Sequence, residues 1–261
     1  MWRASMPPEL DCQLLARARQ KLDLTPLAIH DNYLINLASI DPTIRSKSID
    51  CFRGELERAA AIGAEYLVAH PGSYRNQTLE EGIVNFARGL AEAARGMARG
   101  GVMLLLECTA GGGCHIGSRF EELRSIRDLA ATLTDLPIGY CLDTCHLLAA
   151  GFDIRTPAGL NQTVRDADRI FGMSNVKLIH ANDSKTPLGS RADRHENIGQ
   201  GHIGQAAFRR ILAHPKLRNL PFILETPVDQ EGDDVRNLEM LKKLCPKSSR
   251  TLDRRATIPP A

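Results

Sequence analysis

The sequence has few aromatic residues and almost no net charge. Its 261 residues include one tryptophan, and phenylalanine, tryptophan and tyrosine together make up 5%. Lysine and arginine number 33 against 31 acidic residues, which leaves a formal net charge of +2 at pH 7. These totals neither predict nor exclude a nucleic-acid partner, so any basic surface for DNA has to be local.

Long apolar runs and paired CxxC motifs are also lacking. No run is long enough to cross a bilayer and no signal peptide is recognisable, so we expect no membrane partner. The seven cysteines are odd in number, which favours free thiols in a reducing compartment, the cytoplasm. Cys108, Cys114, Cys141 and Cys145 are expected to be core or rim thiols rather than metal ligands.

The length and the 43% hydrophobic content suit one domain of barrel size, since no linker interrupts the chain. We expect a single monomeric domain over residues 1–245. Residues 246–261 are basic, contain proline and lack periodicity, which is typical of a disordered tail.

Six short apolar runs each end on histidine, aspartate or glutamate. They are Leu27–His30, Tyr66–His70, Val102–Glu107, Ile138–Asp143, Val176–His180 and Phe222–Glu225. Short apolar runs are typical of buried strands in a parallel sheet. The first five runs end 36 to 40 residues apart, which indicates a repeated βα unit. An α/β fold, a (β/α)8 TIM barrel, would gather all six ends on one rim, whereas a doubly wound open sheet would not.

Apolar residues at helical spacing predict helices between these runs. The stripes are Leu10–Leu22, Phe52–Ala60, Leu79–Met97, Phe120–Leu133, Leu160–Phe171, Phe208–Leu212 and Val235–Cys245, and each is expected to bury one face. Thr156 before Pro157 predicts a helix start, and Gly172 predicts its end.

The barrel pattern is interrupted twice. Residues 181–204 are polar and glycine-rich without a clear strand, although barrel symmetry requires one before the helix at Phe208–Leu212. The chain also opens on Met1-Trp2-Arg3 and passes straight into a helix, so the first strand of the barrel is expected to be missing.

The residues at the strand ends suggest a metal site on the shared rim. Imidazoles and carboxylates are the donors that zinc or manganese prefers. A lone histidine or glutamate at a strand end is usually a hydrogen-bonded rim residue, but six such ends converging on one point favour metal binding.

Seven motifs in chain order carry a family resemblance. They are His30–Leu37 (HDNYLINL), His70–Ser73 (HPGS), Glu107–Gly111 (ECTAG), Asp143–His146 (DTCH), His180–Asp183 (HAND), Asp193–His195 (DRH) and Leu224–Thr226 (LET). From about Trp2 to Leu241 the chain resembles endonuclease IV, a family of zinc-dependent enzymes that cut DNA at abasic sites and that belongs to the xylose-isomerase-like TIM barrels.

The resemblance implies three Zn²⁺ ions held by nine side chains. One ion would take His30, His70 and Glu107; a second Glu107, Asp143, His180 and Glu225; and the third His146, Asp193 and His195. Glu107 would bridge two ions, and it is expected to be catalytic together with Asp143 and Glu225.

The resemblance also implies the reaction and the substrate. We expect a deoxyribonuclease that cleaves the phosphodiester bond 5′ to an abasic site by zinc-hydroxide attack and that also removes 3′-blocking groups. The partner would be double-stranded DNA containing abasic sites or blocked 3′ ends. A nucleotide without a base is cheaper to rotate out of the duplex than an intact one, which already gives selectivity.

DNA contacts are expected from the loops of the rim. The resemblance places Tyr33 and Leu34 in a loop that wedges into the minor groove, although without it both would be ordinary loop-packing residues. Arg194 lies between two expected ligands and could contact phosphate or form a structural salt bridge. Further backbone contacts are expected from Arg75, Arg119, Lys185 and Arg191.

Two other functions fit part of the pattern. A xylose-isomerase-like sugar isomerase or epimerase would also place Glu107, Asp143, His180 and Glu225 at strand ends, but it would not need His30, His70, His146, Asp193 and His195. An inactive metal- or lesion-binding barrel is the other alternative, because of the missing first strand. We expect instead that the natural start lies upstream of Met1, since all nine donors are intact.

Overall fold

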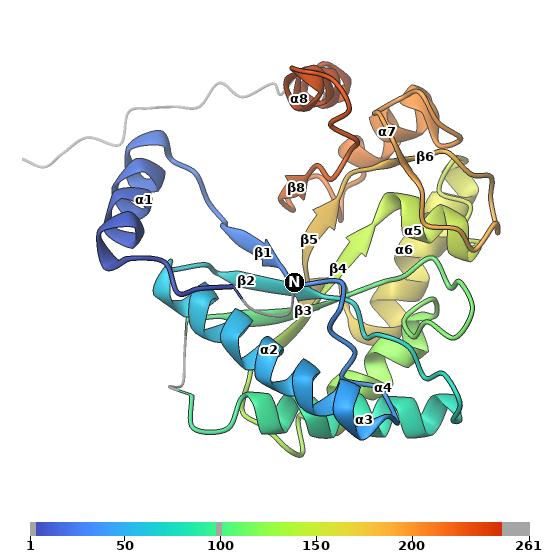
Figure 1. Ribbon diagram of the computed structural model, residues 1–261. Coiled ribbons are helices and arrows are strands. Elements are labelled where there is room, and N and C mark those ends of the chain that lie inside the picture. Colours follow the sequence, from blue (N-terminus) through green and yellow to red (C-terminus); the bar gives the residue numbers. More distant parts are fainter. Residues whose placement is uncertain (1–3, 98–100, 247–261) are drawn as a thin grey trace, which may run out of the picture.

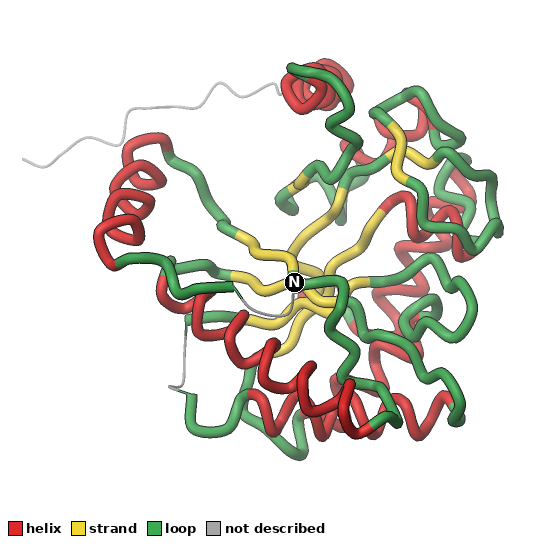
Figure 2. The backbone as a smooth tube through the Cα atoms, in the orientation of Figure 1, coloured by secondary structure: helices red, strands yellow, loops and turns green. Residues whose placement is uncertain are grey.

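The computed structural model describes residues 4–97 and 101–246, and its centre is a parallel sheet of six strands. In spatial order they are β1 (Ala28–His30), β2 (Tyr66–Ala69), β3 (Met103–Glu107), β4 (Ile138–Asp143), β5 (Val176–His180) and β8 (Phe222–Ile223). All six predicted apolar runs are therefore strands. In Figure 2 the strands form one curved sheet with most helices along its outer side.

Helices alternate with the strands, as a TIM barrel requires (Figure 1). They are α1 (Glu9–Leu22), α2 (Pro42–Ala61), α3 (Leu79–Ala93), α4 (Phe120–Ala130), α5 (Thr144–Ala150), α6 (Pro157–Phe171), α7 (Gly204–Ala213) and α8 (Asp233–Leu244), with a short 3₁₀ helix at Met173–Asn175. Along the outer layer α2 packs on α3, α3 on α4 and α4 on α6. The seven predicted helices are present, whereas α5 was not predicted.

The ends of α6 follow local side-chain chemistry. The Thr156 hydroxyl accepts a hydrogen bond from the Gly159 amide at 3.1 Å, and Pro157 occupies the first helical position. Gly172 ends the helix at a φ of 76°, a conformation that other residues rarely adopt. The predicted boundaries of α6 are confirmed. By contrast, α3 and α4 end at Ala93 and Ala130, earlier than their apolar stripes indicated.

The sheet separates two apolar layers, because successive side chains on a strand point to opposite faces. Leu104, Leu106 and Tyr140 point outward and are buried against the helices. The inner face holds a smaller cluster, formed by Val68, Leu105, Cys141 and Leu178 with the partly buried Ala28, Tyr66, Met103 and Ile223. This inner apolar cluster lies directly beneath the predicted donors at the strand ends.

The polar stretch after β5 contributes no strand to the sheet. It forms instead a two-stranded antiparallel ribbon of β6 (Asp183–Ser184) and β7 (His195–Glu196), and β5 pairs directly with β8. The buried Asp183 carboxylate accepts four backbone amides, from Ser184, Gly199, Ile203 and Gly204, at 2.8 to 3.1 Å. Those amides are thereby satisfied within the loop, so the strand that barrel symmetry required at this position is not formed.

Helix α1 lies at the free edge of β1 and has no buried residue. Leu10 is 64% exposed and Leu14 53% exposed, so the prediction that every helix buries one face is wrong here. Its attachment is polar: Arg19 donates to both carboxylate oxygens of Glu65, at 2.7 and 2.8 Å. No strand precedes β1 among the described residues, which leaves this apolar stripe without a sheet to cover.

The described sheet is therefore the larger part of a barrel, open between β1 and β8. The α/β TIM-barrel class is confirmed, and so is the absence of a first strand within the described residues. The expected single domain over 1–245 stays a prediction, and most of the expected tail, residues 247–261, lies outside the described residues. None of the helices in the described part combines the length and the apolar character needed to cross a bilayer.

Candidate metal centre

Strand register brings six of the predicted donors to one point. Each lies two residues after a member of the inner cluster, so its side chain emerges on the same face of the sheet, one layer higher. The pairs are Ala28 and His30, Val68 and His70, Leu105 and Glu107, Cys141 and Asp143, Leu178 and His180, and Ile223 and Glu225. The predicted rim thus consists of one ring of side chains above an apolar floor.

Glu107 is fully buried at the centre of this ring. Its Oε2 lies 3.1 Å from His30 Nε2 and 3.2 Å from His70 Nε2. Its Oε1 lies 2.8 Å from His180 Nδ1 and 3.4 Å from His146 Nδ1. The two oxygens therefore serve opposite sides of the ring, as a carboxylate that bridges two metal positions must.

Three of the imidazoles are oriented by backbone carbonyls. Nδ1 of His30, His146 and His195 donates to the carbonyls of Asp31, Cys108 and Glu225 respectively, each at 2.9 Å. When the ring is neutral, such a bond selects the tautomer whose proton is on Nδ1, so that Nε2 is the nitrogen that can bind a metal.

The buried ring nitrogens show that the donor set fits a metal. Nε2 of His70, His146 and His195 is buried without a hydrogen-bond partner among the described residues. Buried polar atoms are normally paired, and these three face carboxylate oxygens at 3.1 to 3.3 Å without hydrogen-bond geometry. Five imidazoles and four carboxylates are donors that Zn²⁺ accepts.

The third group of donors comes from less regular parts of the chain. Helix α5 positions His146, because the Asp143 carboxylate caps it and accepts the His146 amide at 2.8 Å. The loop between β6 and β7 supplies Asp193, whose oxygens lie 3.1 Å from His146 Nε2 and 3.3 Å from His195 Nε2. The Asp193 side chain remains 49% exposed, so this position opens to solvent.

All nine predicted donors are thus brought together. The sets His30, His70 and Glu107, and Glu107, Asp143, His180 and Glu225, each have ligand atoms within 4.8 Å of one another, and so does Asp143, His146 and His195. The imidazoles also form a chain, with ring centroids 5.1 Å apart for His30 and His70 and 5.3 Å for His70 and His146. The role of each residue as a ligand stays a prediction.

The charges in the centre shift its ionisation. Burial raises the pKa of Glu107, but the charges of His180 and His70 outweigh burial and hold that pKa well below its usual range. Burial lowers the pKa of His30, but the hydrogen bond and charge of Glu107 raise it to about 9. Burial raises the pKa of Asp193, but the neighbouring imidazole of His146, 3.1 Å away, lowers it to about 2. Without metal, imidazolium groups neutralise the carboxylates.

Two buried residues that had been assigned no function touch the donors. Asp31 follows His30, and burial raises its pKa to about 8. Asn182 follows β5 and donates to the Asp143 carboxylate at 2.6 Å. A polar residue one or two positions after a strand that ends in a predicted ligand was the sequence signal for both.

The cysteines are free, and Cys141 lies beneath the donors in the inner cluster. Cys108, Cys141 and Cys145 are buried, as predicted, and Cys114 is partly exposed. Burial raises the pKa of Cys141 to about 12 and that of Cys145 to about 11. The sulfur of Cys141 lies within 4.8 Å of ligand atoms of Glu107 and His180, and that of Cys145 within 4.8 Å of ligand atoms of Asp193 and His195, so the exclusion of the cysteines as ligands stays a prediction.

The predicted DNA contacts surround the centre on loops. Tyr33 is 88% exposed in the turn after β1, and Leu34 is partly buried beside it. Arg194 is exposed, and within the described residues it forms no salt bridge; its guanidinium donates to the Asp193 carbonyl at 2.6 Å. Arg75, Arg119, Lys185 and Arg191 are also exposed. Exposure is compatible with DNA binding, and the contacts themselves stay predictions.

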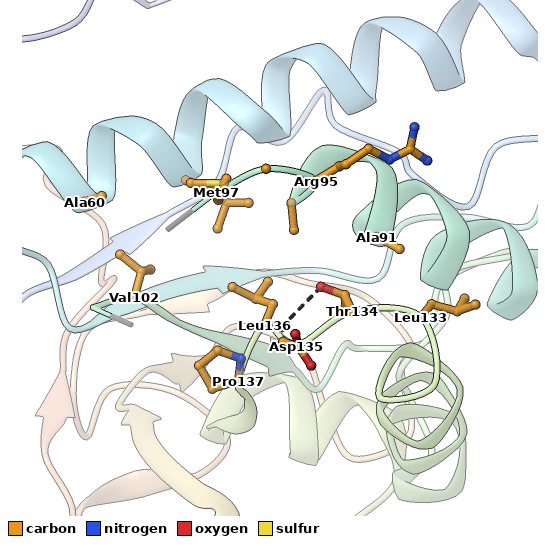
Figure 3. Close-up of a pocket in the computed structure, with 13 residues that line it drawn as sticks. Ala60, Ala91, Arg95, Met97, Val102, Leu133, Thr134, Asp135, Leu136 and Pro137 are labelled. Carbon is orange, nitrogen blue, oxygen red and sulfur yellow. Dashed lines mark hydrogen bonds between the residues drawn. The ribbon is translucent and has the colours of Figure 1, made fainter. Parts of the chain in front are cut away.

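A separate cavity of about 310 Å³ lies at the other end of the sheet. Part of its lining precedes β3 and β4, as Val102, Leu136 and Pro137 in Figure 3 show, and part comes from α2 and α3. No group of metal-binding side chains lines it in the described part of the chain. In a TIM barrel this end serves stability, which favours the candidate metal centre at the opposite end as the functional site.

Comparison with known proteins shows the family. Residues 2–244 match the model of the xylose isomerase-like TIM barrels. A probable endonuclease 4 from Solibacter usitatus is 65% identical over 244 residues, which cover 94% of this chain and 84% of the relative. The chain belongs to the endonuclease IV family. It therefore joins a family of DNA-repair endonucleases, a class of hydrolases.

A solved structure and a more distant relative agree with this placement. Endonuclease IV from Thermus thermophilus superimposes with a TM-score of 0.80 at 34% identity, covering 94% of this chain and 84% of that one. A probable endonuclease 4 from Chloroflexus aurantiacus is 41% identical, covering 93% of this chain and 85% of the relative. A D-tagatose 3-epimerase-like protein has a TM-score of 0.66 at 21% identity, which shows only a shared fold.

Proposed function

We propose that this protein is a zinc-dependent AP endonuclease, a deoxyribonuclease IV. It would cleave the phosphodiester bond 5′ to an abasic site, leaving a 3′-hydroxyl and a 5′-deoxyribose phosphate, and would also remove 3′-blocking groups. The observation that carries the proposal is the convergence of nine donor side chains on one rim, in a chain of the endonuclease IV family.

The donors would hold three zinc ions in the sets described above, with Glu107 shared by two of them. When bound, the ions supply an activated water and positive charge for the phosphoryl and leaving oxygens. In this scheme the oxygen of the water joins phosphorus, the bond from phosphorus to O3′ breaks, and O3′ leaves with a proton as a hydroxyl.

The residues of the chain keep this centre in a reactive form. Glu107 offers one oxygen to each side, and the bond from His30 Nδ1 to a carbonyl directs His30 Nε2 toward Glu107 and the first metal position. Asp143 and Glu225 would supply the other two carboxylates of the second metal position, beside His180. A separate general base would not be needed, because bound zinc would lower the pKa of the attacking water.

Substrate selection would come from the surrounding loops. The exposed Tyr33 and its neighbour Leu34 are suited to insertion into the minor groove, and the exposed Arg194 guanidinium to a phosphate. The substrate is double-stranded DNA with abasic sites or blocked 3′ ends. Seven free thiols support a cytoplasmic, reducing environment, and we propose a monomer.

A duplex with one tetrahydrofuran residue tests the proposal. Zinc-loaded protein should nick it 5′ to the lesion and leave a 3′ end that a polymerase extends, and a chelator should abolish the nick. A duplex ending in 3′-phosphoglycolate tests removal of blocking groups. Absence of nicking by protein that carries three zinc ions would contradict the proposal, and conversion of ketose sugars by the same preparation would favour an epimerase.

A further inference from the structure

Asn182 is a fully buried polar residue between the donors of neighbouring strands. It lies two residues after His180, beyond the end of β5, with Asp143 of β4 on one side and Glu225 on the other. Buried amides are costly unless both ends are hydrogen-bonded, so the partners of this side chain indicate what it does.

The hydrogen bonds of Asn182 determine the orientation of its amide. Nδ2 donates to Asp143 Oδ2 at 2.6 Å, and Oδ1 accepts the Glu225 backbone amide at 2.8 Å. The flipped amide would face a carboxylate with an oxygen and an N–H with an NH₂, so only one orientation is possible. Asp143 Oδ1 meanwhile accepts the His146 amide. Both oxygens of this donor are thus held in place.

The side chain also continues the pairing of β5 with β8 past its regular end. The paired residues stop at His180 and Ile223, and the last backbone bond runs from the Ala181 amide to the Ile223 carbonyl at 2.7 Å. Glu225 lies beyond that point. Its amide is held by Asn182 instead of by a neighbouring strand, so the position of this donor depends on the amide side chain.

Two further contacts connect the amide to the rest of the centre. The Glu225 carbonyl accepts a hydrogen bond from His195 Nδ1 at 2.9 Å, which extends the connection to the third group of donors. Thr144 clamps the backbone of Asn182, because its hydroxyl donates to the Asn182 carbonyl at 2.7 Å and accepts the Asn182 amide at 2.9 Å. The clamp prevents the amide from moving away from the two donors.

We propose that Asn182 is a positioning residue for the metal centre. It holds the Asp143 carboxylate and the Glu225 backbone in the arrangement that the second metal position requires. The proposal rests on the proposed function in one respect, namely that Asp143 and Glu225 bind metal.

Metal affinity of the full chain tests this role without relying on nicking. Asn182→Ala should weaken zinc binding at the second position about 10- to 100-fold in competition with a chromogenic chelator, the usual effect of losing a residue that orients a ligand. It should also change the visible absorption spectrum of the cobalt-loaded protein. If Asn182→Ala does not fold by circular dichroism, Asn182→Ser takes its place in the same titrations.

Asn175 provides a matched control just before the opposite end of β5. Its side chain is also bonded at both ends, donating to the Phe171 carbonyl at 2.6 Å and accepting from Arg127 at 3.0 Å. Asn175→Ala should keep wild-type zinc affinity and the wild-type cobalt spectrum, whatever its effect on stability.

The outcomes separate this inference from the proposed function. Unchanged zinc affinity and spectrum in the Asn182 variant, or equal weakening in the Asn175 variant, would overturn the positioning role while wild-type zinc binding stands. A wild-type protein that binds no zinc would overturn the proposed function itself.

Discussion

Of the donors in the candidate metal centre, Glu107 is fully buried and Asp193 is about half exposed. Glu107 is at the end of a central strand with no exposed surface, and four imidazoles approach its two oxygens. Asp193 is on the loop of the β6–β7 ribbon, and about half of its side chain is exposed. The strand-borne donors are positioned by sheet register, whereas the loop-borne donors depend on local hydrogen bonds such as those of Asp183.

This difference implies a gradient of metal retention. A donor that emerges from a sheet is held by the packing of many residues, while a donor on an exposed loop moves with that loop. We expect the first two positions to retain metal more strongly than the third. Stepwise removal by a chelator should therefore release the ion at Asp193 first.

The largest loss of activity is expected from a substitution of Glu107, the buried donor at the end of β3. Glu107→Gln removes the carboxylate shared by two positions, so turnover on abasic duplex should fall by several orders of magnitude, about 10³-fold or more. Bound zinc, measured by elemental analysis, should fall with it. Glu121→Gln on the exposed face of α4 is the matched control and should behave as wild type. Near-normal nicking by Glu107→Gln would contradict the role of the bridge.

A substitution of Asp193, the donor on the loop between β6 and β7, should reduce activity less. Asp193→Asn removes only the donor between His146 and His195, so one zinc ion should be lost and two retained. Turnover should fall about 100- to 1,000-fold, the usual effect of losing one preorganised group that stabilises developing charge. Loss of all the zinc from this variant would show that the two halves of the centre are not independent.

The pKa of His30 predicts a pH dependence of metal uptake. Because Glu107 raises the pKa of His30 to about 9, zinc must displace a proton there at neutral pH. Affinity at the first position should rise about tenfold per pH unit up to about pH 9 and then level off. Calorimetric titration in two buffers of different ionisation enthalpy measures the released proton, and equal heats in both buffers would exclude it.

The same proton stabilises the metal-free fold. A pKa raised from 6.5 to about 9 means that the stabilisation is complete below pH 6.5 and is lost as the pH rises through about 9. Thermal melts of chelator-treated protein should therefore show a falling melting temperature over this interval, and the zinc-loaded protein should show a weaker dependence.

The smallest effect is expected outside the metal centre. Tyr33→Ala should raise KM for abasic duplex about tenfold, the order of one lost aromatic contact to DNA, with zinc content and melting temperature unchanged. A side chain that is 88% exposed contributes little to folding. Leu10→Ala on α1 is the control, since Leu10 is also exposed and lies on a different part of the molecule. An unchanged KM in the tyrosine variant would show that Tyr33 is an ordinary loop residue that does not contact DNA.

The strand ends and their donors were predictable from the alternation of side chains along each strand. A residue two positions after an inward-facing apolar residue must also face inward, so His70 after Val68 and Glu107 after Leu105 follow from the sequence. The caps of α6 were predictable for an equally local reason, since Thr156 bonds only three residues ahead. The family motifs supplied the loop donor Asp193, which no periodicity indicates.

Only the tertiary structure decided what depends on groups far apart in the chain. The sequence alone determined the strands, their order of donors and the shared rim, because side-chain alternation is a property of each strand by itself. It could not determine that β5 pairs directly with β8, that α1 leaves its leucines exposed, or that Asn182 joins Asp143 to Glu225. Those features depend on which partners fold back to a given residue, and a hydrogen bond between residues 39 or 43 positions apart leaves no periodic trace in the sequence.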